Sequence, residues 1–209
     1  VCKTGPWGQG PVLLQNLSLL RDIDIAAMGP LSPDFVHVVV EAMKLSYADR
    51  EAWYGDPDFV EVPMDDLLSP DYAAARRALI GDRASLELRP GAPGGRQPHL
   101  PDYVVEGRTV TPAAAGAGEP TVARYGSTDD EPGTRPDGST AGDTCHLDII
   151  DRWGNMVSAT PSGGWLQSSP YIPQLGFCLG SRGQMFWLEE GLPASLAPGK
   201  RPRTTLTPS

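Results

Sequence analysis

The sequence lacks any apolar run that approaches the roughly 20 residues needed to span a bilayer. It also has few basic residues: 17 Lys and Arg stand against 26 Asp and Glu, which gives a formal net charge of −9. An excess of acidic groups argues against a nucleic-acid partner or an anionic-membrane surface. We therefore expect a soluble protein that acts on small molecules or peptides.

Cysteine is scarce. The three cysteines, Cys2, Cys145 and Cys178, are an odd number at long spacings, without a CxxC pair or nearby histidines at zinc-ligand spacing. This pattern argues against a disulfide scaffold or a zinc site. The glycines at 8 and 10 lack the third glycine and the preceding strand of a dinucleotide fingerprint, and residues 199–201 lack the hydroxyl of a P-loop. We expect no metal and no cofactor.

Neither end of the chain has the features of a natural terminus. The sequence begins at Val1 without a Met, a basic stretch or an apolar signal segment, and it closes on Thr207-Pro208-Ser209. We expect an internal fragment of a longer protein, and the sequence leaves its compartment undetermined.

Three helices are predicted in the first 80 residues. Apolar residues with helical periodicity follow Pro11 and predict a helix over 11–21. Ser32-Pro33 is typical of a helix start, and the longest helix should run from there to Gly55. Ser69-Pro70 repeats the signal before a shorter helix that ends near residue 80.

Residues 89–143 hold eight Pro and ten Gly and show no sustained period. They predict a flexible linker, and so long a stretch within a compact domain is usually functional or a place where the chain is cut. The pattern then changes: residues 147–150, a glycine-containing turn at 151–155 and residues 156–160 predict a β-hairpin.

Thr144 stands where the predicted linker ends and the first strand begins. Taken alone, it is a polar residue at a strand start. If the chain is cut before it, its new α-amine, with a pKa near 7.7 to 8.0, could act as the base for its own hydroxyl. Cys145 and His146 are not a catalytic pair, because neighbours on a strand point to opposite faces, and His146 is expected to be structural.

Four separated segments resemble one known family. Residues 144–160, TCHLDIIDRWGNMVSAT, resemble the TTHxSVVDxxGNAVSxT that opens the small subunit of γ-glutamyltranspeptidases. Residues 196–208 resemble its APGKRPLSSMSPT, and residues 47–50 and 55–60 resemble its YADR and GDPDFV. The resemblance covers about 1–90 and 142–209.

The resemblance implies an α+β protein, an N-terminal nucleophile hydrolase of αββα-sandwich type that cleaves its own precursor between Asp143 and Thr144. Thr144 would then be nucleophile and base, and Ser162 would orient it, although Ser162 alone reads as a turn residue. Thr204 and Thr205 fall where the family has a serine pair that touches the substrate α-carboxylate, although a Thr pair is also ordinary in a strand.

The implied organisation has three parts. Residues 1–88 would be the helical end of the large subunit, 89–143 the linker, and 144–209 the start of the small subunit. The two subunits would form a heterodimer after cleavage. The family's tandem-glycine oxyanion hole lies beyond residue 209 and its carboxylate-binding Arg before residue 1, so the fragment alone should be nearly inert.

One departure from the family concerns the substrate amine. The family's acidic turn, whose Asp takes the substrate α-ammonium, is replaced here by Leu179 to Phe186, without a carboxylate and with Arg182. An unpaired ammonium in a desolvated pocket is costly, so Arg182 favours a carboxylate-bearing acyl group, unless it is a solvated turn residue. Lys200, Arg201 and Arg203 are interpreted as a solvated turn rather than a phosphate site.

The leading hypothesis is an amide hydrolase or acyltransferase that attacks glutathione or another γ-glutamyl amide and passes the acyl group to water or an amine acceptor. The first alternative is an acylase similar to the cephalosporin and glutaryl acylases. The second is an inactive member of the family that serves as a binding module.

Overall fold

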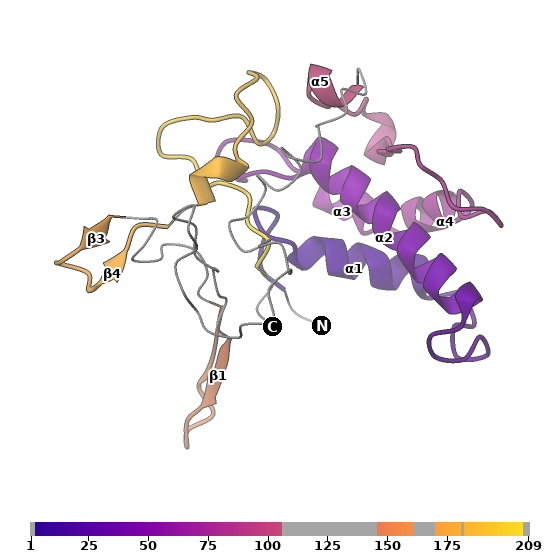
Figure 1. Cartoon of the computed structure of the whole chain (residues 1–209), viewed down its shortest axis with the longest axis horizontal. Helices are drawn as coiled ribbons and strands as arrows, with labels where there is room; N and C mark the ends of the chain where they lie inside the picture. Colours follow the sequence, from indigo (N-terminus) through magenta and orange to yellow (C-terminus); the bar gives the residue numbers. More distant parts are fainter. Residues whose placement is uncertain (1–2, 106–145, 161–169, 181, 207–209) are drawn as a thin grey trace, which may run out of the picture.

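The computed structural model describes residues 3–105, 146–160, 170–180 and 182–206. In Figure 1, the helices α1 (Gly10–Leu20), α2 (Pro33–Trp53) and α4 (Pro70–Arg77) gather into one body. Two strand pairs extend away from this body on the other side of the molecule (Figure 1). The described residues are therefore mixed helix and strand, as predicted, while the αββα sandwich remains a prediction.

The sequence predicted the three main helices and their start signals. Ser32 Oγ accepts a hydrogen bond of 3.1 Å from the Phe35 amide, and Ser69 Oγ accepts one of 3.2 Å from the Tyr72 amide. Each serine thereby satisfies an amide that has no partner within its own helix. The short helices α3 (Met64–Leu67) and α5 (Asp102–Val105) were not predicted, because a single turn carries no periodic pattern.

The helical body has two small apolar clusters near α1, which packs against both α2 and α4. One contains Val12, Tyr54 and Leu67, and the other contains Leu19, Ala42 and Leu45. Much of the remaining interior is polar. The polar and charged residues that are at most 6% exposed include Gln15, Glu41, Asp49, Arg50, Asp56, Arg76 and Arg203.

The first part of the predicted linker lies against this body. Arg89 forms an ion pair of 3.1 Å with Glu41, and the Gly91 amide donates a hydrogen bond of 2.7 Å to a carboxylate oxygen of Asp49. The segment also forms a turn of 3-10 helix, η1 (Pro93–Gly95), whose Pro93 is buried. Residues 106–143 of the predicted linker lie outside the described part.

The predicted hairpin is present as β1 (Leu147–Ile150) and β2 (Met156–Ala159), paired antiparallel with Leu147 opposite Ala159. Its turn is closed by Asp151, whose Oδ1 accepts hydrogen bonds from the Trp153 and Asn155 amides at 2.8 and 3.0 Å. Gly154 has φ +84°, a conformation that favours glycine. The sequence therefore supplies both the turn and its register.

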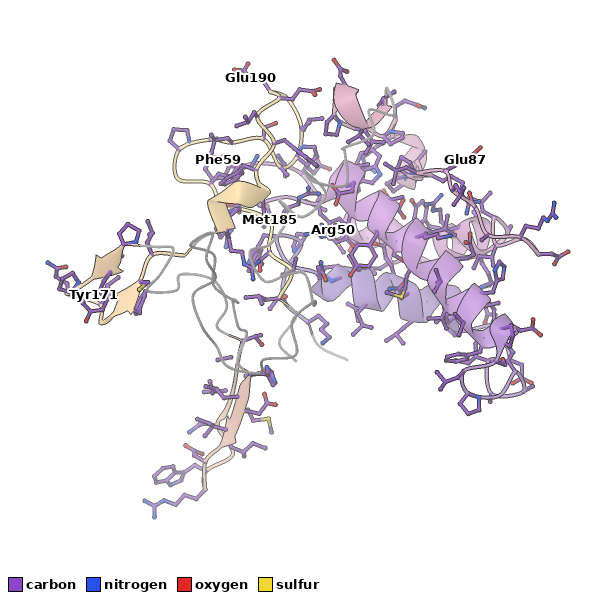
Figure 2. The ribbon with its side chains drawn as sticks, in the orientation of Figure 1. Arg50, Phe59, Glu87, Tyr171, Met185 and Glu190 are labelled. Atoms are coloured by element: carbon purple, nitrogen blue, oxygen red, sulfur yellow. The ribbon has the colours of Figure 1, made fainter. Side chains whose placement is uncertain are left out.

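A second, shorter hairpin pairs β3 (Tyr171–Ile172) with β4 (Phe177–Cys178). Tyr171, labelled in Figure 2, begins β3 and pairs with Cys178. Within the described ranges, no helix is both long and apolar enough to cross a bilayer.

Candidate active site

Thr204 lies in the last described segment, where the chain passes the C-terminal end of α2. Its amide donates a hydrogen bond of 2.6 Å to the Trp7 carbonyl, and its carbonyl accepts one of 3.4 Å from Arg50 Nη2. Arg50, labelled in Figure 2, belongs to the last turn of α2. The main chain of Thr204 is thus held on both sides by residues from the first quarter of the chain.

The Thr204 hydroxyl also has a local role. Its Oγ1 accepts a hydrogen bond of 3.1 Å from the Leu206 amide, which closes a tight turn around Thr205. Hydroxyl side chains often stabilise turns in this way. Thr204 and Thr205 are both half-buried, so the structure brings the predicted pair together on one short, anchored turn.

Arg203 precedes this pair and is buried, with 3% of its surface exposed. Its Nη2 donates a hydrogen bond of 2.9 Å to Glu51 Oε2, and its Nη1 donates one of 3.1 Å to the Arg50 carbonyl. The guanidinium also lies over the Trp187 ring, 5.3 Å from the ring centre. The interpretation of Arg203 as part of a solvated turn was wrong, because its guanidinium is buried and forms an ion pair with Glu51 near the end of α2.

Arg201 is held by the loop that follows α2. Its amide and Nε donate to the two oxygens of Asp56 at 2.8 and 2.9 Å, and its Nη2 lies 2.6 Å from Asp58 Oδ2. The hydrogen bonds from Arg201 lower the pKa of Asp56 to about 2, although burial of that carboxyl opposes the shift. Arg201 also stacks on the Trp7 ring at 4.4 Å.

Lys200 also contacts the loop that follows α2, at a longer distance. Its Nζ lies over the Phe59 ring, 5.9 Å from the centre, and Phe59 is labelled in Figure 2. The three basic residues of the 200–203 segment therefore contact residues 51–59, and the sequence could have suggested this from the acidic GDPD stretch. Their pairing was not predicted.

The hairpin β1–β2 carries a row of polar side chains on one face. His146 Nδ1 lies 2.7 Å from Thr160 Oγ1, and His146 Nε2 lies 2.9 Å from Asp148 Oδ2. Hydrogen bonds from Ser158 and then from His146 lower the pKa of Asp148. His146 faces Thr160 and Asp148 faces Ser158, so the strand register continues at least to the pair 146 and 160.

Arg182 begins a turn of 3-10 helix, η2 (Arg182–Met185), and is half-buried. Burial lowers the pKa of its guanidinium. Met185 of this turn is labelled in Figure 2, and two residues later Trp187 meets Arg203. It is Trp187, five residues after Arg182, that contacts the segment containing the Thr pair.

The other predicted site residues, Asp143, Thr144 and Ser162, lie outside the described residues. Their nearest described neighbours in sequence are His146 and Thr160. In the ranges the structure does describe, no group of three or more His, Cys, Asp and Glu side chains is placed to hold a metal ion.

Sequence reasoning missed a buried polar centre in the helical body. Asp49 accepts hydrogen bonds from Gln15, Tyr72 and the Gly91 amide at 3.1, 3.0 and 2.7 Å, and pairs with Arg76 at 3.2 Å. Burial raises the pKa of Asp49, and Arg76 opposes that shift. Asp49 stands in the YADR segment that resembled the family, which was the available signal.

Comparisons with known proteins agree with the sequence motifs. The model of the family described as gamma-glutamyltranspeptidase matches residues 1–209. The glutathione hydrolase proenzyme of Bacillus subtilis subsp. natto is 31% identical over 212 residues, which are 100% of this chain and 32% of that protein. The acylase ACY 1 proenzyme of Pseudomonas sp. (strain SE83) is 29% identical and covers 97% of this chain and 29% of that protein.

Solved structures give the same result for the fold. The structure of LmbA2991HD is 56% identical, with a TM-score of 0.70 over 99% of this chain and 30% of that chain. The cephalosporin acylase from Bacillus halodurans is 24% identical, with a TM-score of 0.63 over 98% of this chain and 28% of that one. The chain thus spans about a third of the length of the proteins that it matches.

Proposed function

Because the chain belongs to the γ-glutamyltranspeptidase family, we propose that the full-length protein is an N-terminal nucleophile hydrolase with an αββα sandwich. Its substrates would be γ-glutamyl amides such as glutathione. The proposal includes cleavage of the precursor between Asp143 and Thr144, which would leave a large and a small subunit joined as a heterodimer. Two of the relatives above are themselves named as proenzymes.

In the proposed reaction, the α-amine of Thr144 takes the proton of the Thr144 hydroxyl, and the oxygen attacks the amide carbonyl of the substrate. The C–N bond breaks, the amine product leaves with that proton, and an ester to Thr144 remains. Water or an amine then attacks the ester, which releases the acyl group and restores the hydroxyl.

The match of the family model to residues 1–209 is the observation that carries this proposal. The described part of the segment that resembles the start of the small subunit supports it. Strands β1 and β2 pair antiparallel, and the bond between His146 and Thr160 continues that register by one pair. We assign the nucleophile to Thr144 and the orienting hydroxyl to Ser162, as the family resemblance implies.

The anchored turn at Thr204 and Thr205 supports the second part of the proposal, recognition of the acyl group. A hydroxyl pair on a fixed main chain can hold a substrate carboxylate through hydrogen bonds that need little further ordering. We assign Thr204 and Thr205 to the α-carboxylate and Arg182 to negative charge on the acyl group.

The alternative substrate is an acyl amide without an α-ammonium, such as a glutaryl amide. One observation favours it: the segment from Leu179 to Phe186 has no carboxylate to pair with an ammonium. A Cβ at Gly183 would meet nothing within 4 Å among the described atoms, so Gly183→Asp can introduce a carboxylate without a clash.

The test uses the full-length protein with γ-glutamyl- and glutaryl-p-nitroanilide, which share one leaving group. Hydrolysis of either, together with two bands on a denaturing gel, supports the proposal. A single band without hydrolysis favours the inactive binding module instead. A preference for the γ-glutamyl substrate above about a hundredfold would exclude the acylase alternative, whereas Gly183→Asp should raise that preference about tenfold.

A further inference from the structure

Two buried arginines and one glutamate form a closed cluster directly beside the Thr pair. Glu51 Oε1 accepts a hydrogen bond of 3.0 Å from Arg50 Nη1, while its Oε2 accepts one of 2.9 Å from Arg203 Nη2. Arg203 Nη1 reaches back to the Arg50 carbonyl at 3.1 Å. The orientation of each guanidinium is therefore fixed. Both bind the Glu51 carboxylate, and the Arg203 guanidinium also binds the Arg50 carbonyl.

Burial restricts the movement of both guanidinium groups. Arg50 and Arg203 are 4% and 3% exposed, and Trp187 covers the guanidinium of Arg203. A buried arginine that loses its carboxylate partner is costly, so alternative positions of Arg203 are disfavoured. Because Thr204 follows Arg203 directly, its backbone is constrained by this anchor as well as by the Trp7 carbonyl and by Arg50.

We propose that Arg203, fixed by Glu51 and Trp187, is a positioning residue that holds Thr204 and Thr205 against the α-carboxylate of the acyl substrate. The inference rests on the proposed function. It adds that Trp7, Arg50 and Glu51, which precede the cleavage bond, fix the position of the Thr pair, which follows that bond and contacts the substrate carboxylate. The large subunit therefore shapes the carboxylate subsite of the small subunit.

The experiment compares Arg203→Met and Arg203→Lys with the unmutated full-length enzyme on three p-nitroanilides. The γ-glutamyl and glutaryl substrates carry the carboxylate, and the 4-aminobutyryl substrate lacks it. We expect Arg203→Met to raise KM for the two carboxylate substrates about tenfold or more, with kcat changed less than about threefold. The kcat/KM for the 4-aminobutyryl substrate should stay within about threefold, and Arg203→Lys should restore part of the loss.

Arg76→Met is the matched control, since Arg76 is also a buried, ion-paired arginine but is bonded to Asp49, Leu45 and Arg89. It should lower stability without a carboxylate-selective change in KM. An equal rise in KM for all three substrates in Arg203→Met, or the same selective rise in Arg76→Met, would overturn the inference.

Hydrogen exchange distinguishes a failure of this inference from a failure of the proposed function. In Arg203→Met, amide exchange at Thr204 and Leu206 should be about tenfold faster or more, while Arg76→Met should leave these amides protected. If the unmutated enzyme cleaves none of the three substrates, the proposed function fails, and the exchange data still decide whether Arg203 fixes the Thr pair. Unchanged exchange at Thr204 in Arg203→Met would show that it does not.

Discussion

The helical body and the β1–β2 hairpin differ in what they bury. The body encloses charged groups within hydrogen-bonded pairs, as for Asp49 with Arg76 and Arg203 with Glu51. The hairpin leaves large apolar side chains in solvent, each more than half exposed: Ile149, Ile150, Trp153, Met156 and Val157. The body thus pairs these buried charges with groups of its own, whereas apolar surface like that of the hairpin is typical of a contact surface.

The two regions also differ in their proposed parts in the reaction: the body positions the substrate contact, and the hairpin follows the nucleophile. The ion pairs that hold the C-terminal segment belong to the body, and the proposed nucleophile, Thr144, precedes the hairpin in the sequence. Substitutions in the two regions should therefore have different consequences.

Thr144→Ala should abolish both cleavage of the precursor and hydrolysis of γ-glutamyl-p-nitroanilide, with a loss of about 10³-fold or more in kcat/KM. The physical reason is that alanine has no oxygen to form the acyl ester. A denaturing gel and a p-nitroaniline assay on the full-length protein measure the two effects. The melting temperature should hardly change, because the helical body is untouched.

Thr204→Ala serves as the comparison for that experiment, since it removes a proposed substrate contact but leaves the nucleophile. It should still give two bands. If the Thr144→Ala precursor is cleaved at the same bond as the unmutated protein, the nucleophile has been misassigned.

The same substitution placed in both regions tests the difference in burial. Asp49→Asn leaves the buried Arg76 without its anion and should lower the free energy of unfolding by about 3 kcal/mol or more. Asp148→Asn removes a carboxylate whose side chain is 58% exposed and should leave the free energy of unfolding nearly unchanged. Urea unfolding of the full-length variants measures both. Equal losses would mean that the hairpin is buried in the complete protein.

Local signals in the sequence predicted most of the secondary structure. Ser32-Pro33 and Ser69-Pro70 are start signals that depend only on the adjacent backbone, and both cap helices as expected. The turn at Asp151 and Gly154 is similarly local. The one-turn helices α3 and α5 could not be predicted, because four residues carry neither a period nor a cap of this kind.

The buried charges could not be predicted from the same signals. Arg203 follows a Pro in a polar stretch, and periodicity gives no reason to place it against Glu51, which lies 152 residues earlier. The pairing of Arg201 with Asp56 is equally remote in sequence. The family motifs indicated which segments matter, but only the fold shows that these segments contact each other.

Acid should weaken the body through Asp56. Its pKa in the folded protein is lowered to about 2, against about 3.9 in an unfolded chain, so its contribution to stability is complete above pH 4. That contribution is lost as the pH falls from about 4 to about 2. Arg201 is 42% exposed and water screens the pair, so we expect a loss of about 1 kcal/mol.

Melting temperatures between pH 5 and pH 2 measure this loss, with Asp56→Asn as the control that has no carboxylate to titrate. The variant should be less stable at pH 5, and its stability should fall less steeply on acidification. Identical slopes for the two proteins would assign the acid sensitivity to other carboxylates.

The smallest effect is expected from the thiols. Cys178 is buried in β4, and Cys145 should point away from the proposed nucleophile if the strand is regular, because neighbouring residues face opposite sides. Cys145→Ser and Cys178→Ser should each keep kcat/KM within about threefold of the unmutated enzyme, and iodoacetamide should leave most of the activity. Complete loss of activity in Cys145→Ser, with the precursor cleaved and the melting temperature unchanged, would mean that the sulfur takes part in the reaction. The reaction would then depend on Cys145 as well as on Thr144.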